Sequence, residues 1–186
     1  MSFSSDVAGI IGLYLGRYCL LDWIDIGKLS WLHLSANPRA IDLLTSNPGI
    51  DWIYLSENPA AIDLLTANPE LIDWDYLSEN PAAIDLLAAN PDRIDWDRLC
   101  SNPGAMPLLI ANPNRINWEC LSSNPAAIDL LVTNLERIDW RNLSGNPAAI
   151  DLLAANPNRI NWDLVSLNPA AMPLLITKPK LIGWFF

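Results

Sequence analysis

The sequence predicts an all-α solenoid, and three observations lead to that prediction. A motif of 22 residues, N-P-A-A-I-D-L-L-x-x-N-P-x-x-I-D-W-x-x-L-S-x, recurs about seven times. Most copies contain two Asn-Pro pairs, which interrupt any longer helix. Tryptophans recur every 22 residues, at Trp52, Trp74, Trp96, Trp118, Trp140, Trp162 and Trp184. Trp31 joins this column once a one-residue deletion in the segment 47–51 is allowed for. Self-similarity at a period of about 20 to 50 residues is typical of solenoids.

Each repeat is expected to hold two short helical elements. The halves 80–86 and 90–96 share one form, Asn-Pro followed by two free positions, a branched apolar residue, Asp and a large apolar residue. Asn is a favourable N-cap, and Pro suits the first helical position. We therefore predict helix caps at the first Asn of each repeat: Asn37, Asn58, Asn80, Asn102, Asn124, Asn146 and Asn168.

The start of each helix has two interpretations. Asp, Asn or Pro occupies the fifth position after the capping Asn, and all three residue types favour a helix start. Pro107 and Pro173 at that position would remove a hydrogen bond from a helix that began at the Asn. The Asn-Pro stretch is then a separate turn or 3₁₀ segment, so we expect a mixture of short α and 3₁₀ elements.

Apolar columns predict one continuous core along residues 31–186, about seven repeats of a single solenoid domain. Ile84 and Leu87 lie three residues apart on one helix face, and Ala83 beside them permits close approach of successive layers. Trp takes the position of Leu86 in the other half-repeat, which predicts that the tryptophans are buried. The rival interpretation is that the Trp and Asp columns bind carbohydrate or peptide.

The two ends differ from the array. Residues 1–30 do not follow the repeat, and the apolar stretch 7–24 is interpreted as an N-terminal capping helix rather than a membrane segment, because Arg17 and Asp22 lie inside it. At the other end, the apolar Trp184, Phe185 and Phe186 predict an association surface. A protein partner, or self-association as an end-to-end dimer, would cover it.

Charge and composition restrict the function. Twenty-one acidic and eleven basic residues give a net charge of −10, which argues against a nucleic-acid ligand. Arg93, Arg115, Arg137 and Arg159 form a column, interpreted as inter-repeat ion pairs rather than a phosphate stripe. Three cysteines and a first segment without the positive charge of a secretory signal predict an intracellular location, in the cytoplasm or a virion.

The sequence contains few residues that could form a reactive centre. His33 is the sole histidine, and Cys19, Cys100 and Cys120 lack the paired spacing of metal ligands. Cys100 stands where other copies have Ser and is interpreted as a substituted turn residue. We predict no catalytic residue, no metal site and no cofactor.

The signature L-S-x-N-P-x-A-I-x-L-L-x-x-N-P-x-x-I-x-W at residues 77–96 resembles the short Asn-Pro repeats of predicted proteins from large nucleocytoplasmic DNA viruses and some protists. The resemblance covers roughly residues 31–184. The Ala-Met-Pro-Leu-Leu variants at 105–109 and 171–175 give a partial likeness to leucine-rich variant repeats, which implies alternating α and 3₁₀ helices in a right-handed superhelix. Neither family supplies functional residues. The resulting expectation is a non-enzymatic scaffold for protein interaction or assembly, with a virion component as one version.

Overall fold

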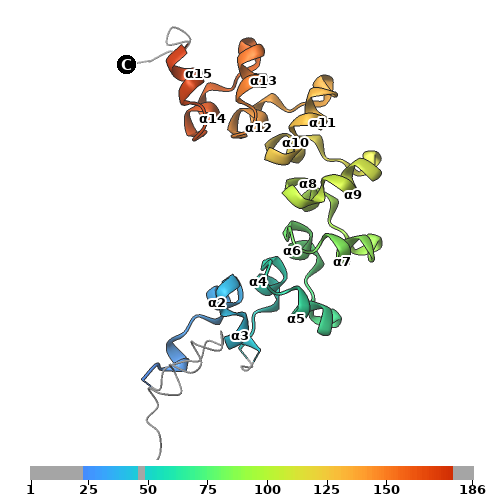
Figure 1. Cartoon of the computed structure of the whole chain (residues 1–186), viewed down its shortest axis with the longest axis vertical. Helices are drawn as coiled ribbons and strands as arrows, with labels where there is room; N and C mark the ends of the chain where they lie inside the picture. Colours follow the sequence, from blue (N-terminus) through green and yellow to red (C-terminus); the bar gives the residue numbers. More distant parts are fainter. Residues whose placement is uncertain (1–22, 46–48, 178–186) are drawn as a thin grey trace, which may run out of the picture. The chain divides into compact units, whose positions relative to one another are not determined.

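The computed structural model describes residues 23–45 and 49–177, and these residues contain α-helices and 3₁₀ helices but no β-strand (Figure 1). The all-α repeat solenoid predicted from the period of 22 is therefore confirmed. The chain divides between Ile94 and Asp95 into two compact units, which are described separately.

The described residues of the N-terminal unit contain three α-helices that begin at a tryptophan, which we call Trp helices, and three that begin at an isoleucine, which we call Ile helices. The Trp helices are α2 (Trp31–Ser35), α4 (Trp52–Glu57) and α6 (Trp74–Glu79). The Ile helices are α3 (Ile41–Leu44), α5 (Ile62–Ala67) and α7 (Ile84–Ala88). The 3₁₀ helices are η1 (Ile26–Lys28), η2 (Pro38–Ala40), η3 (Pro69–Leu71) and η4 (Pro91–Arg93).

The C-terminal unit repeats the same alternation, with Met replacing Ile at the start of two helices. Its Trp helices are α8 (Trp96–Ser101), α10 (Trp118–Ser123), α12 (Trp140–Gly145) and α14 (Trp162–Leu167). Its Ile helices are α9 (Met106–Ala111), α11 (Ile128–Val132), α13 (Ile150–Ala155) and α15 (Met172–Thr177). The 3₁₀ helices are η5 (Pro103–Ala105), η6 (Pro113–Arg115), η7 (Pro125–Ala127), η8 (Leu135–Arg137) and η9 (Pro157–Arg159).

The start of the Ile helices resolves which of the two interpretations of the Asn-Pro stretch is right. Each Ile helix follows the Asn-Pro turn and begins after an alanine that makes no side-chain cap, as at Ala61 before α5. Its Asp lies in the first turn, where a carboxylate favours the N-terminal end of the helix dipole. Pro107 also lies in a first turn, that of α9, where no intrahelical N–H bond is lost. The Asn-Pro stretch is thus a separate turn or 3₁₀ segment.

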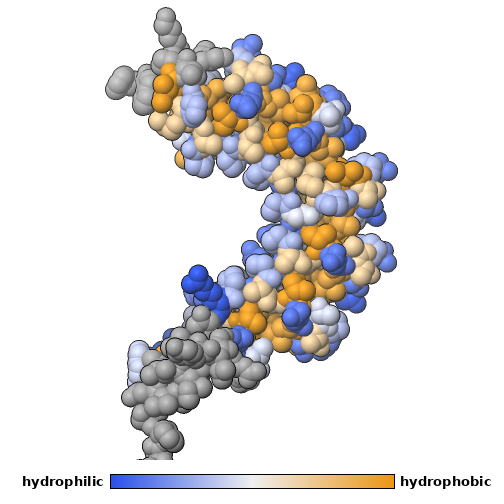
Figure 2. Space-filling model, in the orientation of Figure 1, coloured by the Kyte–Doolittle hydropathy of each residue, from blue (hydrophilic) through white to orange (hydrophobic). Residues whose placement is uncertain are grey.

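The core of each unit lies between the two rows of helices. Three columns of leucine and alanine carry most of it, and members such as Leu55, Ala61 and Leu65 are completely buried. Consecutive Trp helices contact each other directly, α2 with α4 and α4 with α6 in the N-terminal unit. Within each unit, Figure 2 shows hydrophobic residues along the middle of the visible face and hydrophilic residues on both margins. Since each helix has only four to six residues, neighbour packing must stabilise it.

Gly49 lies at the place where one residue is missing from the repeat. A Cβ atom on Gly49 would lie 2.6 to 2.8 Å from ring carbons of Trp31, so only glycine fits without displacing the indole. The shortened chain therefore passes directly against the ring. This contact gives a physical reason for the irregular glycine in the first junction.

The predicted capping segment, residues 1–30, lies mostly outside the described residues. Its described part contains η1, with the Asp25 carboxylate accepting from the Gly27 N–H at 3.0 Å. Trp23 is 80% exposed. No helix among the described residues is long and apolar enough to cross a membrane.

Candidate functional site

The seven asparagines predicted as caps bind the turn that follows them. In each case the side-chain oxygen accepts the N–H two residues later at 2.9 to 3.0 Å, as Asn124 does from Ala126. Six of the seven are buried, and only Asn37 in the first layer is exposed. The cap is one of two roles of this residue.

The other role is a ladder of hydrogen bonds between successive repeats, which the repeat pattern did not predict. The Asn124 side-chain nitrogen donates to the carbonyls of Cys100 and Asn102, at 2.9 and 3.1 Å. Asn146 donates in the same way to Ser122 and Asn124, at 3.1 and 3.0 Å. Asn58 and Asn80 make equivalent bonds in the N-terminal unit. Each asparagine thus satisfies buried groups in two layers.

A buried serine near the end of most Trp helices forms a second ladder. The Ser122 hydroxyl donates to the Trp118 carbonyl at 2.7 Å and accepts the Asp139 N–H of the next repeat at 3.0 Å. Ser35, Ser56 and Ser144 accept the corresponding N–H groups in their own units. At Cys100 the sulfur accepts the Asn117 N–H at 3.2 Å. Cys100 is therefore a buried helical residue, and its interpretation as a turn residue is wrong.

The Asn of the second half-repeat does not act as an N-cap. Asn68, Asn90, Asn112, Asn134 and Asn156 make no side-chain cap to the 3₁₀ helix that follows. Their side-chain nitrogens donate backwards, to the carbonyl four residues earlier, at 2.8 to 2.9 Å. Because these side-chain N–H groups bind carbonyls of the preceding helix, the asparagines cap the C-terminal end of that helix. Identical Asn-Pro pairs therefore have different roles in the two halves.

The described tryptophans of the column, from Trp31 to Trp162, are half-buried rather than buried, which corrects the expectation from the sequence. Four of them are covered on one side by an arginine 19 residues later. The guanidinium carbons of Arg93, Arg137 and Arg159 lie 5.0 Å from the ring centroids of Trp74, Trp118 and Trp140. Arg115 lies 5.8 Å from Trp96.

The arginine column therefore has another partner than we expected. The structure places each guanidinium over an indole ring rather than beside a carboxylate of the described residues. The negative face of the indole attracts the cation, and the ring gains cover that its position at the layer edge does not provide. A ligand that stacked on these rings would have to displace the arginines.

The acidic column starts the Trp helices. Asp51, Asp73, Asp95 and Asp139 accept N–H groups of the first turn, as Asn117 and Asn161 do where they replace Asp. The Asp139 carboxylate accepts from Asn142 at 2.7 Å. These side chains are therefore engaged in helix capping, and the described residues contain no group of three or more His, Cys, Asp or Glu placed to hold a metal ion.

Burial makes the two described thiols less reactive. Burial raises the pKa of the Cys100 thiol, and it also raises the pKa of Cys120. A raised pKa leaves less of the nucleophilic thiolate at neutral pH. The His33 Nδ1 lies 2.7 Å from the hydroxyl of Ser30, the residue that caps α2.

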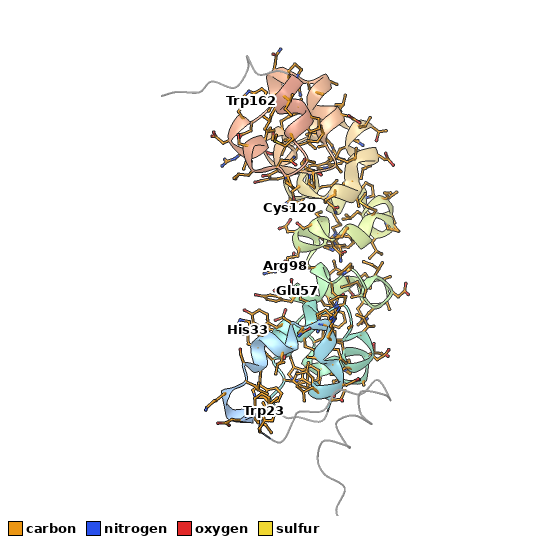
Figure 3. The ribbon with its side chains drawn as sticks, turned by 60° about the vertical axis from the view of Figure 1, so that its left-hand side comes forward. Trp23, His33, Glu57, Arg98, Cys120 and Trp162 are labelled. Atoms are coloured by element: carbon orange, nitrogen blue, oxygen red, sulfur yellow. The ribbon has the colours of Figure 1, made fainter. Side chains whose placement is uncertain are left out.

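The outward face of the Trp helices changes most in chemistry from repeat to repeat. Two positions after each Trp, the residues are His33, Tyr54, Tyr76, Arg98, Cys120, Asn142 and Leu164. Five positions after each Trp, they are Ala36, Glu57, Glu79, Ser101, Ser123, Gly145 and Leu167. We call this surface the Trp-helix face. Figure 3 shows His33 and Glu57 on it in the N-terminal unit.

The N-terminal unit has a pocket on this face. Its volume is about 190 Å³, and it is lined by Tyr54, Glu57, Asn58 and Pro59 of one repeat and Ala36 of the previous one. The Tyr54 ring lies against Tyr76, with ring centroids 6.2 Å apart and planes inclined by 48°. Aromatic rings beside a carboxylate make a site for a cation.

A larger pocket of about 330 Å³ lies beside Trp74, with Arg93 and Glu70 among its lining residues. The Trp74 indole nitrogen is buried and has no hydrogen-bond partner in the described residues. Because Arg93 covers the ring face, this pocket offers a ligand less aromatic surface than the Trp column suggests.

The predicted association surface, Trp184, Phe185 and Phe186, lies outside the described residues. Comparison of the chain with known protein families, characterised proteins and solved structures gave no match.

Proposed function

We propose that this chain is a non-enzymatic repeat scaffold that binds a protein partner along the Trp-helix face, a virion assembly being one setting for it. The observation that carries the proposal is the contrast between buried and outward columns. Buried positions keep Ser or Cys, Asn, Leu or Val, and Ala through the repeats. In contrast, the position two residues after each Trp holds six residue types in seven repeats. Solenoids bind along an extended surface of this kind.

Two observations support a scaffold over the rival, a carbohydrate- or peptide-binding module that uses the Trp and Asp columns. Arginines cover the faces of four indole rings, and the acidic residues cap helices. These four rings and the capping carboxylates therefore already have structural partners. The raised pKa values of the Cys100 and Cys120 thiols also favour a role without catalysis.

Site-specific photo-crosslinking tests the proposal. A photoreactive phenylalanine analogue replaces Tyr54 or Tyr76 on the Trp-helix face, and Thr66 or Ala88 on the Ile helices as matched controls within the same unit. Irradiation in an extract of the native source should give a discrete protein adduct from positions 54 and 76 and little from 66 and 88. Equal adducts from both faces, or adducts from the Ile helices alone, would contradict the proposal.

A further inference from the structure

We infer that the pocket between α2 and α4 binds an arginine side chain from an extended basic segment of the partner. The inference rests on the proposed function and names its chemistry. Tyr54 and Glu57 are three residues apart and therefore share one face of α4. Both line the pocket of about 190 Å³.

The floor of the pocket is already satisfied, which leaves the aromatic ring and the carboxylate as the recognition groups. The Asn58 nitrogen donates to the Ser35 carbonyl at 2.8 Å, and its oxygen accepts the Ala60 N–H at 3.0 Å. Pro59 and Ala36 add apolar walls. A guanidinium can lie flat against Tyr54 while its N–H groups donate to the Glu57 carboxylate, and its aliphatic stem then contacts the apolar walls.

Charge complementarity identifies the occupant as a cation. Residues 1–94 contain four basic and thirteen acidic residues, a net charge of −9, whereas residues 95–186 contain seven basic and eight acidic residues, a net charge of −1. Almost all of the net negative charge therefore belongs to the unit that holds the pocket. A field of this sign raises the rate at which a basic segment arrives.

The pairing of an aromatic ring with a carboxylate is confined to α4 and α6 of the Trp helices. The sequence Tyr-Leu-Ser-Glu occurs at 54–57 and 76–79, whereas later repeats carry Arg98 with Ser101, Cys120 with Ser123 and Asn142 with Gly145. The flanking Ile53, 44% exposed, and Leu32, 37% exposed, give the rest of an extended peptide apolar contacts. The site is thus local to one part of the array.

Guanidinium is a better occupant than ammonium. Arginine stacks its planar group on an aromatic ring and binds a carboxylate with two parallel hydrogen bonds, whereas lysine offers a compact, strongly hydrated charge. An arginine peptide should therefore bind more tightly than its lysine counterpart. A citrulline peptide, which keeps the shape and loses the charge, should bind weakest.

The test is a fluorescence anisotropy titration of the full chain with a labelled glycine-serine peptide that carries two arginines. Lysine and citrulline versions are titrated in parallel. Glu57→Gln should weaken arginine-peptide binding about tenfold, the order expected for loss of one charge-assisted hydrogen bond. Tyr54→Leu should also weaken it. Asp63→Asn on α5 makes the same charge change outside the pocket and should alter binding less than twofold.

A graft supplies the complementary test in the C-terminal unit. Asn142→Tyr with Gly145→Glu places the pair on α12, where Asn146 and Pro147 already correspond to Asn58 and Pro59. A Cβ atom on Gly145 meets nothing within 4 Å, so the new side chain fits. The grafted chain should bind a second arginine peptide.

Several results would overturn the inference. They are no binding of the arginine peptide, equal binding of the citrulline peptide, or an equal loss in Glu57→Gln and Asp63→Asn, which would show a net-charge effect alone. If crosslinking at positions 54 and 76 still yields a partner, the inference fails while the proposed function stands. If crosslinking at positions 66 and 88 equals or exceeds crosslinking at positions 54 and 76, the inference and the proposed function both fail.

Discussion

Replacing Asn124 should reveal how much the asparagine ladder stabilises the solenoid. Its side chain is 1% exposed and makes three hydrogen bonds, one that caps the Asn-Pro turn and two to carbonyls of the preceding repeat. The cap contributes roughly 1 kcal/mol. Each buried bond to a carbonyl adds about 1 kcal/mol. Asn124→Ala should therefore lower the free energy of unfolding by about 3 kcal/mol.

Two further variants separate the cap from the ladder. Asn124→Ser keeps a cap acceptor but is too short to reach the previous repeat, so it should lose about 2 kcal/mol. Asn114→Ala alters an exposed asparagine in η6 and should change stability by less than about 0.5 kcal/mol.

Urea unfolding followed by far-ultraviolet circular dichroism measures the free energy of unfolding of all three variants. If Asn124→Ala and Asn124→Ser each match Asn114→Ala, the side-chain bonds between repeats do not stabilise the fold, and the reasoning is wrong.

Other predictions concern particular contacts. Gly49→Ala should lower the urea midpoint because its Cβ would meet the Trp31 ring at 2.6 Å, whereas Gly145→Ala in open space should raise stability by up to about 1 kcal/mol; equal effects would refute the close contact. In a Cys19→Ser background, Cys120 should react with a disulfide reagent faster than buried Cys100. Both should react more slowly at pH 7 than a free thiol, because their raised pKa values reduce the fraction of thiolate, and both rates should increase as the pH rises. Fast reaction of Cys100 would contradict its burial. Changing Trp184, Phe185 and Phe186 to Ser should lower the molar mass found by light scattering without loss of helix signal, whereas an unchanged monomer would refute association through these residues.

The period of 22, the short helices and the mixture with 3₁₀ segments were all predictable, because Asn-Pro spacing and apolar periodicity act within one repeat. The hydrogen bonds from Asn124 to Cys100 and Asn102 were not predictable, because they depend on how one layer packs against the next. A signal was present: Ser or Cys recurs at one position and Asn two residues later, although neither is apolar. Constant polar residues beside a core column indicate buried hydrogen bonds.

The tryptophan column shows why the candidate site needed the structure. Burial of Trp74 was expected from its equivalence to Leu86, yet both residues are half-buried and line the same pocket. Arg93 then covers it from a 3₁₀ helix 19 residues later. The shared 22-residue spacing of Trp and Arg was visible in the sequence, but it fits an ion-pair column equally well. The pocket at Tyr54 and Glu57 depends on the packing of α2 against α4 and has no signature within one repeat.

Excision of one complete repeat tests the central claim, that stability comes from ladders and core contacts between adjacent layers. Deleting residues 118–139 removes 22 residues and joins Asn117 to Trp140, which restores every column in register. Deleting residues 118–128 removes half as many but breaks the alternation of Trp and Ile helices. The mean residue ellipticity at 222 nm should be unchanged by the longer deletion and reduced by the shorter one. Loss of helix in the longer deletion, or equal retention in both, would contradict the account.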